Sequence, residues 1–178
     1  MRERYRTIAR VAKAHGRRGE VVTEPVHGLP SLVTPGLRVA VLPPELRGER
    51  WHEVRACSSD GRSGQLVSLS GVDDLASAER LVGRVLLARE KDLPADLALH
   101  DAERLVGRLV RSVADGLEAP IVEVMQGPAN DVWVVEARGR EVLLPVIDDV
   151  VREVPETGPI PVSVPRGLGW PGEEGSDA

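Results

Sequence analysis

Short apolar segments recur along this chain of 178 residues, and each one ends at a cluster of glycine, proline or serine. The segments are rich in valine, which favours strands over helices. In the first half we expect strands at 5–14, 20–24, 37–42, 51–56, 65–69 and 84–88. In the second half we expect them at 105–112, 120–125, 132–137, 141–146, 150–154 and 160–164. Short strands between such turns are typical of barrels and sandwiches, so the sequence predicts an all-β fold.

One short helix is expected in the N-terminal half. Asp73 or Asp74 can cap its start, and Leu75, Ala78 and Val82 would share one face. Gly83 follows as a stop signal. In the C-terminal half, the pair at 138–139 predicts a tight hairpin between two strands.

The order of these segments predicts two small β-barrels joined by a linker. We assign residues 1–90 to an N-terminal barrel and residues 91–102, which are polar at first and contain a proline, to the linker. A second barrel would occupy 103–169. The acidic end, 170–178, is expected to be disordered.

The charge of the chain is unevenly distributed. The net charge is −5, yet residues 1–18 hold seven Arg or Lys against one acid, Glu3. This segment therefore carries +6 and the remainder −11. Such a division allows one focused contact with RNA, and it also allows an acidic surface that binds a basic protein.

The composition gives no support to catalysis or to a metal site. Cys57 is the single cysteine, and the four histidines are widely spaced, so we expect no catalytic residues, no metal and no cofactor. A hydrolase that uses Cys57 is the enzymatic alternative, and it would need a positioned base. The sequence has no apolar run of about 20 residues and no secretory signal, so we expect a cytoplasmic protein without a membrane segment.

Two loops are candidate binding sites, although their residues alone favour a structural role in both. The turn at 15–20 holds two glycines that permit a chain reversal, and it also presents His15, Arg17 and Arg18, which suit phosphate. The 127–131 loop launches a strand, and its polar tip, Asn130 and Asp131, could be a docking point.

Aromatic side chains are scarce. The chain has no Phe, and its aromatics are Tyr5, Trp51, Trp133 and Trp170. We expect Trp51 and Trp133 to be buried or partly buried, and we expect no broad platform for stacking RNA bases. Any RNA contact would then be made by the basic N-terminal region.

Four stretches, taken in order, resemble the RimM family: IARVAKAHGRRGEVVTEP at 8–25, GVDDLASAERLVGRVLLAREKDLP at 71–94, GPANDVWVVEARGREVLLPVIDDVVREV at 127–154 and IPVSVPRGL at 160–168. The resemblance implies a six-stranded N-terminal barrel like domain two of translational GTPases, followed by a linker and a PRC-barrel. Many family members carry an aromatic pair before the second domain, whereas here the matching stretch contains His100 and Asp101.

The resemblance also implies a function. The family assists late assembly of the head of the 30S small ribosomal subunit and the processing of its 16S rRNA, without a reaction or a cofactor of its own. Its partner is small-subunit ribosomal protein nineteen, which is contacted chiefly by the PRC-barrel side. We therefore expect a monomer that binds the pre-small subunit through His15, Arg17, Arg18, His100, Asp101, Asn130 and Asp131. The alternatives are a direct rRNA-binding module of the translation-factor barrel type and a stand-alone PRC-barrel adaptor.

Overall fold

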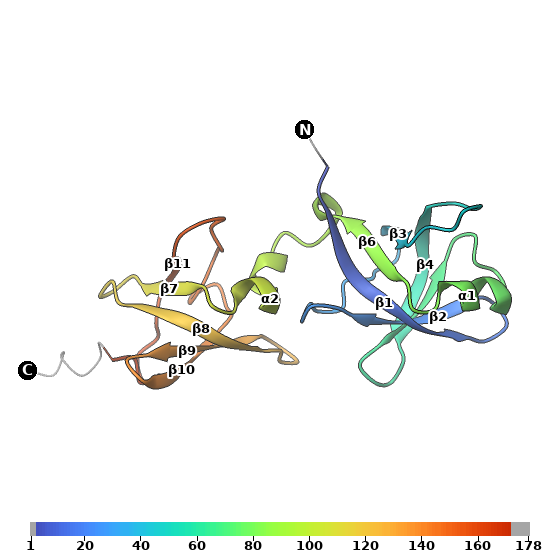
Figure 1. Ribbon diagram of the computed structural model, residues 1–178. Helices are drawn as coiled ribbons and strands as arrows, with labels where there is room; N and C mark the ends of the chain where they lie inside the picture. The colour runs from blue at the N-terminus through green and yellow to red at the C-terminus, as the bar shows by residue number, and fades with distance from the viewer. Residues whose placement is uncertain (1–2, 172–178) are drawn as a thin grey trace, which may run out of the picture. The chain divides into compact units, whose positions relative to one another are not determined.

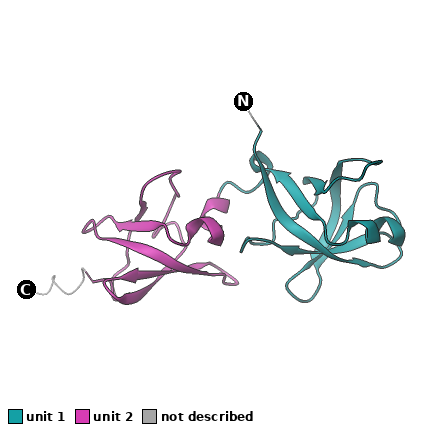
Figure 2. Ribbon diagram, viewed as in Figure 1, with its two compact units in different colours: residues 1–95 teal, residues 96–178 magenta. Residues whose placement is uncertain are grey.

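The computed structural model describes residues 3–171. The chain divides into two compact units, which we call unit 1 (Met1–Ala95) and unit 2 (Asp96–Ala178) (Figure 2). Both are built on strands, so the predicted all-β fold with two β-domains is confirmed. Within the described residues, no helix is long and apolar enough to cross a membrane.

Unit 1 is a closed barrel of six strands in the order β1-β2-β5-β4-β3-β6 (Figure 1). The strands are β1 (Tyr5–His15), β2 (Glu20–Pro25), β3 (Arg38–Leu42), β4 (Trp51–Ser59), β5 (Gln65–Leu69) and β6 (Val85–Arg89). Neighbouring strands are antiparallel, and β1 closes the barrel against β6. In β3, for example, Val39 and Val41 are buried while Arg38 is exposed. This alternation places valine inside and charge outside.

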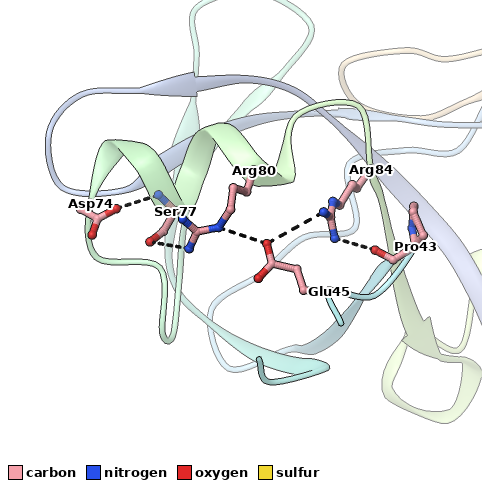
Figure 3. Close-up of polar contacts among 6 residues, drawn as sticks. All are labelled: Pro43, Glu45, Asp74, Ser77, Arg80 and Arg84. Atoms are coloured by element: carbon pink, nitrogen blue, oxygen red, sulfur yellow. Dashed lines mark hydrogen bonds and ion pairs between the residues drawn. The ribbon is translucent and has the colours of Figure 1, made fainter. Parts of the chain in front are cut away.

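The predicted helix of unit 1 is α1 (Leu75–Leu81). Asp74 caps it, because its Oδ1 accepts a hydrogen bond from the Ser77 amide at 2.7 Å (Figure 3). The predicted apolar face is wrong in part. Ala78 and Leu81 are buried, whereas Leu75 and Val82 are 41% and 44% exposed. The helix ends before Val82, which is the C-cap in an extended conformation, so this side chain no longer follows the helical period.

An ion-pair cluster holds the 43–50 loop to α1 and to Arg84, which immediately precedes β6 (Figure 3). The Oε1 atom of Glu45 lies 3.3 Å from Arg80 Nε and 3.9 Å from Arg84 Nη2. Arg84 also donates to the carbonyl oxygen of Pro43 at 2.7 Å. These contacts hold the loop at Pro43, where it begins, and at Glu45.

Unit 2 is a five-stranded sheet in the order β10-β9-β8-β7-β11. Its strands are β7 (Leu109–Ser112), β8 (Glu118–Met125), β9 (Val132–Ala137), β10 (Arg140–Pro145) and β11 (Ile160–Val162). The sheet is antiparallel except for β11, which pairs with β7 in parallel. Its described strands form an open order, so hydrogen bonds do not close the predicted second barrel. The predicted hairpin at 138–139 is confirmed, with positive φ at Arg138 and Gly139.

Several predicted segments of unit 2 differ in the structure. Residues 150–154 are not a strand, because the amides of Val150 and Val151 both donate to the carbonyl oxygen of Ile147 in a turn. The chain before β7 forms a second helix, α2 (Ala102–Leu105), where a strand was predicted from residue 105. Two short 3-10 helices, η1 (Glu90–Asp92) and η2 (Leu97–Leu99), occupy part of the predicted linker, and η1 begins one residue before it. The η2 helix belongs to unit 2.

The indole of Trp170 fixes the end of the described chain to unit 2. Trp170 is 3% exposed, and its Nε1 donates to Asp115 Oδ2 at 3.1 Å. Asp115 Oδ1 also accepts from the Leu117 amide at 3.0 Å. Ordered structure therefore extends into the segment that was assigned to an acidic tail, whose remainder, 172–178, lies outside the described residues.

The same carboxylate makes the stability of unit 2 sensitive to acid. The pKa of Asp115 lies below its ordinary value, chiefly because the Leu117 amide donates to it and further because the Trp170 indole does. An unfolded Asp has a pKa of about 3.9. The stabilisation is thus complete above that pH and is lost as the pH falls through the lower folded-state pKa.

We expect Asp115→Asn to flatten this acid dependence, because the amide oxygen still accepts hydrogen bonds but does not titrate. The measurement is the urea midpoint of unit 2 at pH values between neutral and about 3. It can be followed by the fluorescence of Trp133 and Trp170 in a Trp51→Phe background, which removes the tryptophan of unit 1. Parallel pH profiles for the wild type and the variant would show that Asp115 does not contribute.

Candidate functional site

The 127–131 loop and the segment before α2 meet in unit 2. The Nδ1 atom of His100 lies 2.7 Å from Asp131 Oδ2, although the two residues are 31 positions apart. A carboxylate only accepts hydrogen bonds, so Nδ1 carries the proton. The other oxygen of Asp131 accepts a long bond, 3.4 Å, from the Gly127 amide. Asp131 is 7% exposed, and its main task is to hold this loop and His100 together.

Gly127 allows the loop its tight course. A Cβ atom at this position would lie 2.2 Å from the carbonyl oxygen of Asn130, which is backbone and cannot move independently. Asn130 itself is exposed at the tip. The predicted structural role of the loop and the predicted polar tip therefore coexist in one turn.

A hollow of about 450 Å³ opens beside this contact. Its polar lining includes His100, Asn130 and two exposed carboxylates, Asp96 and Asp148. Neither carboxylate stands out in the sequence, because each one looks like an ordinary surface charge. The lining also contains apolar side chains, namely Leu99, Ile147 and Val151.

Asp101 has a different position from the other predicted residues of unit 2. It is 2% exposed, and its carboxylate accepts from the Arg104 amide as the N-cap of α2. Arg104 Nε also lies 3.6 Å from Asp101 Oδ2. The structure thus places Asp101 at the start of the helix, with its carboxylate buried.

The remaining predicted residues lie at the connection between β1 and β2 in unit 1, where His15 ends β1 and Arg17 and Arg18 belong to the turn. All three are exposed, and among the described residues none of their side chains has a hydrogen-bond or ion-pair partner. Gly16 and Gly19 both have positive φ, as the turn prediction requires. The seven predicted residues thus form two groups, one in each unit.

The two units differ in net charge. Unit 1 contains 16 Arg or Lys and 12 Asp or Glu, and unit 2 contains 7 and 16. Unit 1 is therefore +4 and unit 2 is −9. In the described part of the chain, no group of three His, Cys, Asp or Glu side chains is placed to hold a metal ion.

Comparisons with known proteins identify the family. Residues 6–93 match the family model described as the RimM N-terminal domain. The ribosome maturation factor RimM of Roseiflexus sp. (strain RS-1) is 35% identical over 83% of this chain and 80% of its own length. That of Thermoanaerobacter sp. (strain X514) is 31% identical over 84% of this chain and 89% of its own. The chain belongs to the RimM family of ribosome maturation factors.

Two solved RimM structures are also similar to it. One is a crystal structure of RimM from Pseudomonas aeruginosa, with 22% identity, a TM-score of 0.42 and coverage of 91% of this chain and 98% of that chain. The other is the solution structure of the RimM N-terminal domain from Thermus thermophilus. It has 25% identity and a TM-score of 0.38 over 51% of this chain and 95% of that chain.

Proposed function

We propose that this RimM chain assists late assembly of the 30S head and processing of 16S rRNA by binding ribosomal protein nineteen of the small subunit through unit 2. The observation that supports this most is the charge of −9 on unit 2. Ribosomal proteins are basic, so an acidic domain attracts them and steers their approach. The chain acts by binding and carries out no reaction.

The hollow beside the 127–131 loop suits a basic side chain of that partner. Asp96 and Asp148 provide negative charge at its rim, and Leu99 and Ile147 provide an apolar wall. A lysine or arginine buries its aliphatic stem against apolar surface and keeps its charged head near carboxylates. Asn130 adds an amide that both donates and accepts hydrogen bonds.

A calorimetric titration of the full chain with purified ribosomal protein nineteen tests the proposal. We expect binding at low salt that weakens steeply as the ionic strength rises. Asp148→Lys should weaken it by about tenfold, since it places a like charge against a basic partner. Gly127→Ala should also weaken it, because the loop must change course to relieve its contact with Asn130.

Glu141→Lys is the matched control for Asp148→Lys. It makes the same change in charge at an exposed position of β10 that does not line the hollow. Equal losses for the two variants would mean that only the net charge matters. No binding at low salt, with both proteins folded, would refute the choice of partner.

A direct contact with rRNA is the second candidate function, and one observation favours it. The side chains of His15, Arg17 and Arg18 are exposed and have no hydrogen-bond or ion-pair partners among the described residues, so the imidazole and the two guanidinium groups are available to phosphate. Binding of naked head-domain rRNA that is lost in the double variant Arg17→Glu, Arg18→Glu would support this role.

If the chain serves assembly, its deletion should cause free small subunits with unprocessed rRNA to accumulate.

A further inference from the structure

We propose that the outer surface of the unit 1 barrel holds an unpaired base of single-stranded RNA at a site formed by Tyr5, Trp51, Arg38 and Arg89. The proposal rests on the proposed function only in taking the RNA of a pre-ribosomal particle as the ligand. It concerns residues that are separate from the turn at 15–20. We call these four residues the aromatic site.

Four neighbouring strands bring the aromatic site together, in the order β4-β3-β6-β1. Trp51 begins β4 and pairs with Ala40 of β3, while Tyr5 begins β1 and pairs with Arg89 of β6. Ala40 is small, which leaves room for the indole to lie across β3. Arg38 is two positions from Ala40 and therefore faces outward with it.

The rings and guanidinium groups are in direct contact. The ring centroids of Tyr5 and Trp51 are 5.8 Å apart, with their planes at 42°. The Cζ atoms of Arg38 and Arg89 lie 5.8 and 5.2 Å from the Trp51 centroid. These distances are typical of cation–π pairs. Tyr5 is 43% exposed, and Trp51 is half-buried, so aromatic surface remains open to solvent.

Glu3 fixes one side of the aromatic site. It accepts hydrogen bonds from the Tyr5 hydroxyl and from Lys91 Nζ, both at 2.9 Å. Its Oε2 atom also lies 3.5 Å from Arg89 Nε. The start of β1 is thereby tied to the end of β6, and the Tyr5 ring is held in place before any ligand arrives. Such preorganisation reduces the entropy that binding must overcome.

Arg38 is the cation that remains available. It is exposed, and no described carboxylate lies within ion-pairing distance of it. Its planar guanidinium can stack on a base or bind a phosphate with paired donors. The surrounding unit has a net charge of +4, which favours a polyanion.

Aromatic rings with arginine planes beside them are the surface on which proteins stack splayed-out RNA bases. An acidic peptide would use the arginines but not the rings. We therefore infer RNA, with one base at the site and a neighbouring phosphate on Arg38. The positions of the four aromatic residues in the sequence do not predict this site. Tyr5 and Trp51 come into contact only when β1 and β4 are joined through the two strands between them.

The experiment titrates the full chain with a fluorescently labelled, unstructured RNA of adenosine and cytidine, about twelve nucleotides long. We expect Trp51→Leu to weaken binding by about 5- to 100-fold, because a base loses its stacking partner. Trp51→Phe should retain most of the affinity. Unlabelled RNA should quench the tryptophan fluorescence of the wild type but not of Trp51→Leu, since Trp133 and Trp170 are buried.

Arg38→Ala changes an exposed side chain and so separates loss of binding from loss of folding. We expect this variant to bind RNA more weakly. Its affinity should also depend less on salt: the slope of log K against log salt concentration should become shallower by about 0.7, the value for one lost phosphate contact on a single strand. Arg17→Ala should reduce the salt slope as well but leave the quenching intact. This contrast distinguishes the aromatic site from the turn.

Two results would overturn the proposal. One is unchanged RNA affinity in both Trp51→Leu and Arg38→Ala. The other is equal quenching by an acidic peptide such as polyglutamate, which would indicate a protein ligand. Binding of ribosomal protein nineteen, measured without RNA, should be unaffected by Trp51→Leu, so this proposal and the proposed function can fail independently.

Discussion

A Gly19→Ala variant should lose about 2–4 kcal/mol of the stability of unit 1, which is a large effect for one methyl group. Gly19 has a φ of +78°, a conformation that costs free energy for any residue with a Cβ. An added Cβ would also lie 2.4 Å from the carbonyl oxygen of Val72 and 2.8 Å from the amide nitrogen of Asp74. Both are backbone atoms, so no side chain can rotate to relieve the overlap.

Gly16→Ala is the matched control in the same turn. Its φ is +68°, but the nearest atom to an added Cβ is Glu20 Oε2 at 3.6 Å, an ordinary contact with a flexible side chain. It should therefore cost only about 1–2 kcal/mol, from the backbone conformation alone. Hydrogen exchange of the β1 and β2 amides under increasing urea measures both variants in the intact chain. Equal losses would show that the approach to α1 contributes nothing.

The contact between Gly19 and the chain before α1 has a functional consequence. It sets the turn that carries Arg17 and Arg18 against the capped start of the helix, where Asp74 binds the Ser77 amide. A rigid support keeps the two exposed cations in one place. If the turn binds RNA, Gly19→Ala should reduce that binding at urea concentrations at which unit 1 is still folded.

Local patterns in the sequence were sufficient to predict most strands. The burial pattern of a strand such as β3 can be predicted from its alternating apolar and polar residues. The type of a turn such as 138–139 can be predicted from residues that tolerate positive φ. Both signals depend on positions a few residues apart. The wrong prediction of a strand at 150–154 also comes from relying on such local signals. Val150 and Val151 are adjacent and both buried, which suggests an apolar run, but they pack as a turn and not as a ladder.

The candidate sites could be predicted only in part, because packing creates them. His100 and Asp131 are separate candidates in the sequence, and nothing in their spacing indicates the hydrogen bond between them. Tyr5 and Trp51 are likewise unconnected until the barrel closes. The charge division is visible in the sequence. Residues 1–18 carry +6, whereas the remainder of unit 1 carries −2, so the positive charge of unit 1 lies in its first 18 residues.

A second large effect is expected in the core of unit 2. Trp133 is fully buried, and its Nε1 donates to the carbonyl oxygen of Leu99 at 3.1 Å. Trp133→Ala should cost about 3–5 kcal/mol through the cavity that it leaves. Trp133→Phe keeps an aromatic ring but leaves the Leu99 carbonyl without this donor, which should cost about 1–3 kcal/mol.

The indole of Trp133 also links the sheet to the residues around the hollow. Leu99 precedes His100, and both line the hollow beside Asp131. Trp133→Phe should therefore speed hydrogen exchange in 97–100 and weaken binding of ribosomal protein nineteen, beyond what its loss of stability explains. Trp170→Phe is the matched control, because it removes a buried indole donor that binds Asp115 instead. If both variants loosened 97–100 and weakened binding equally, the hollow would depend on the overall stability of unit 2 and not on the bond to Leu99.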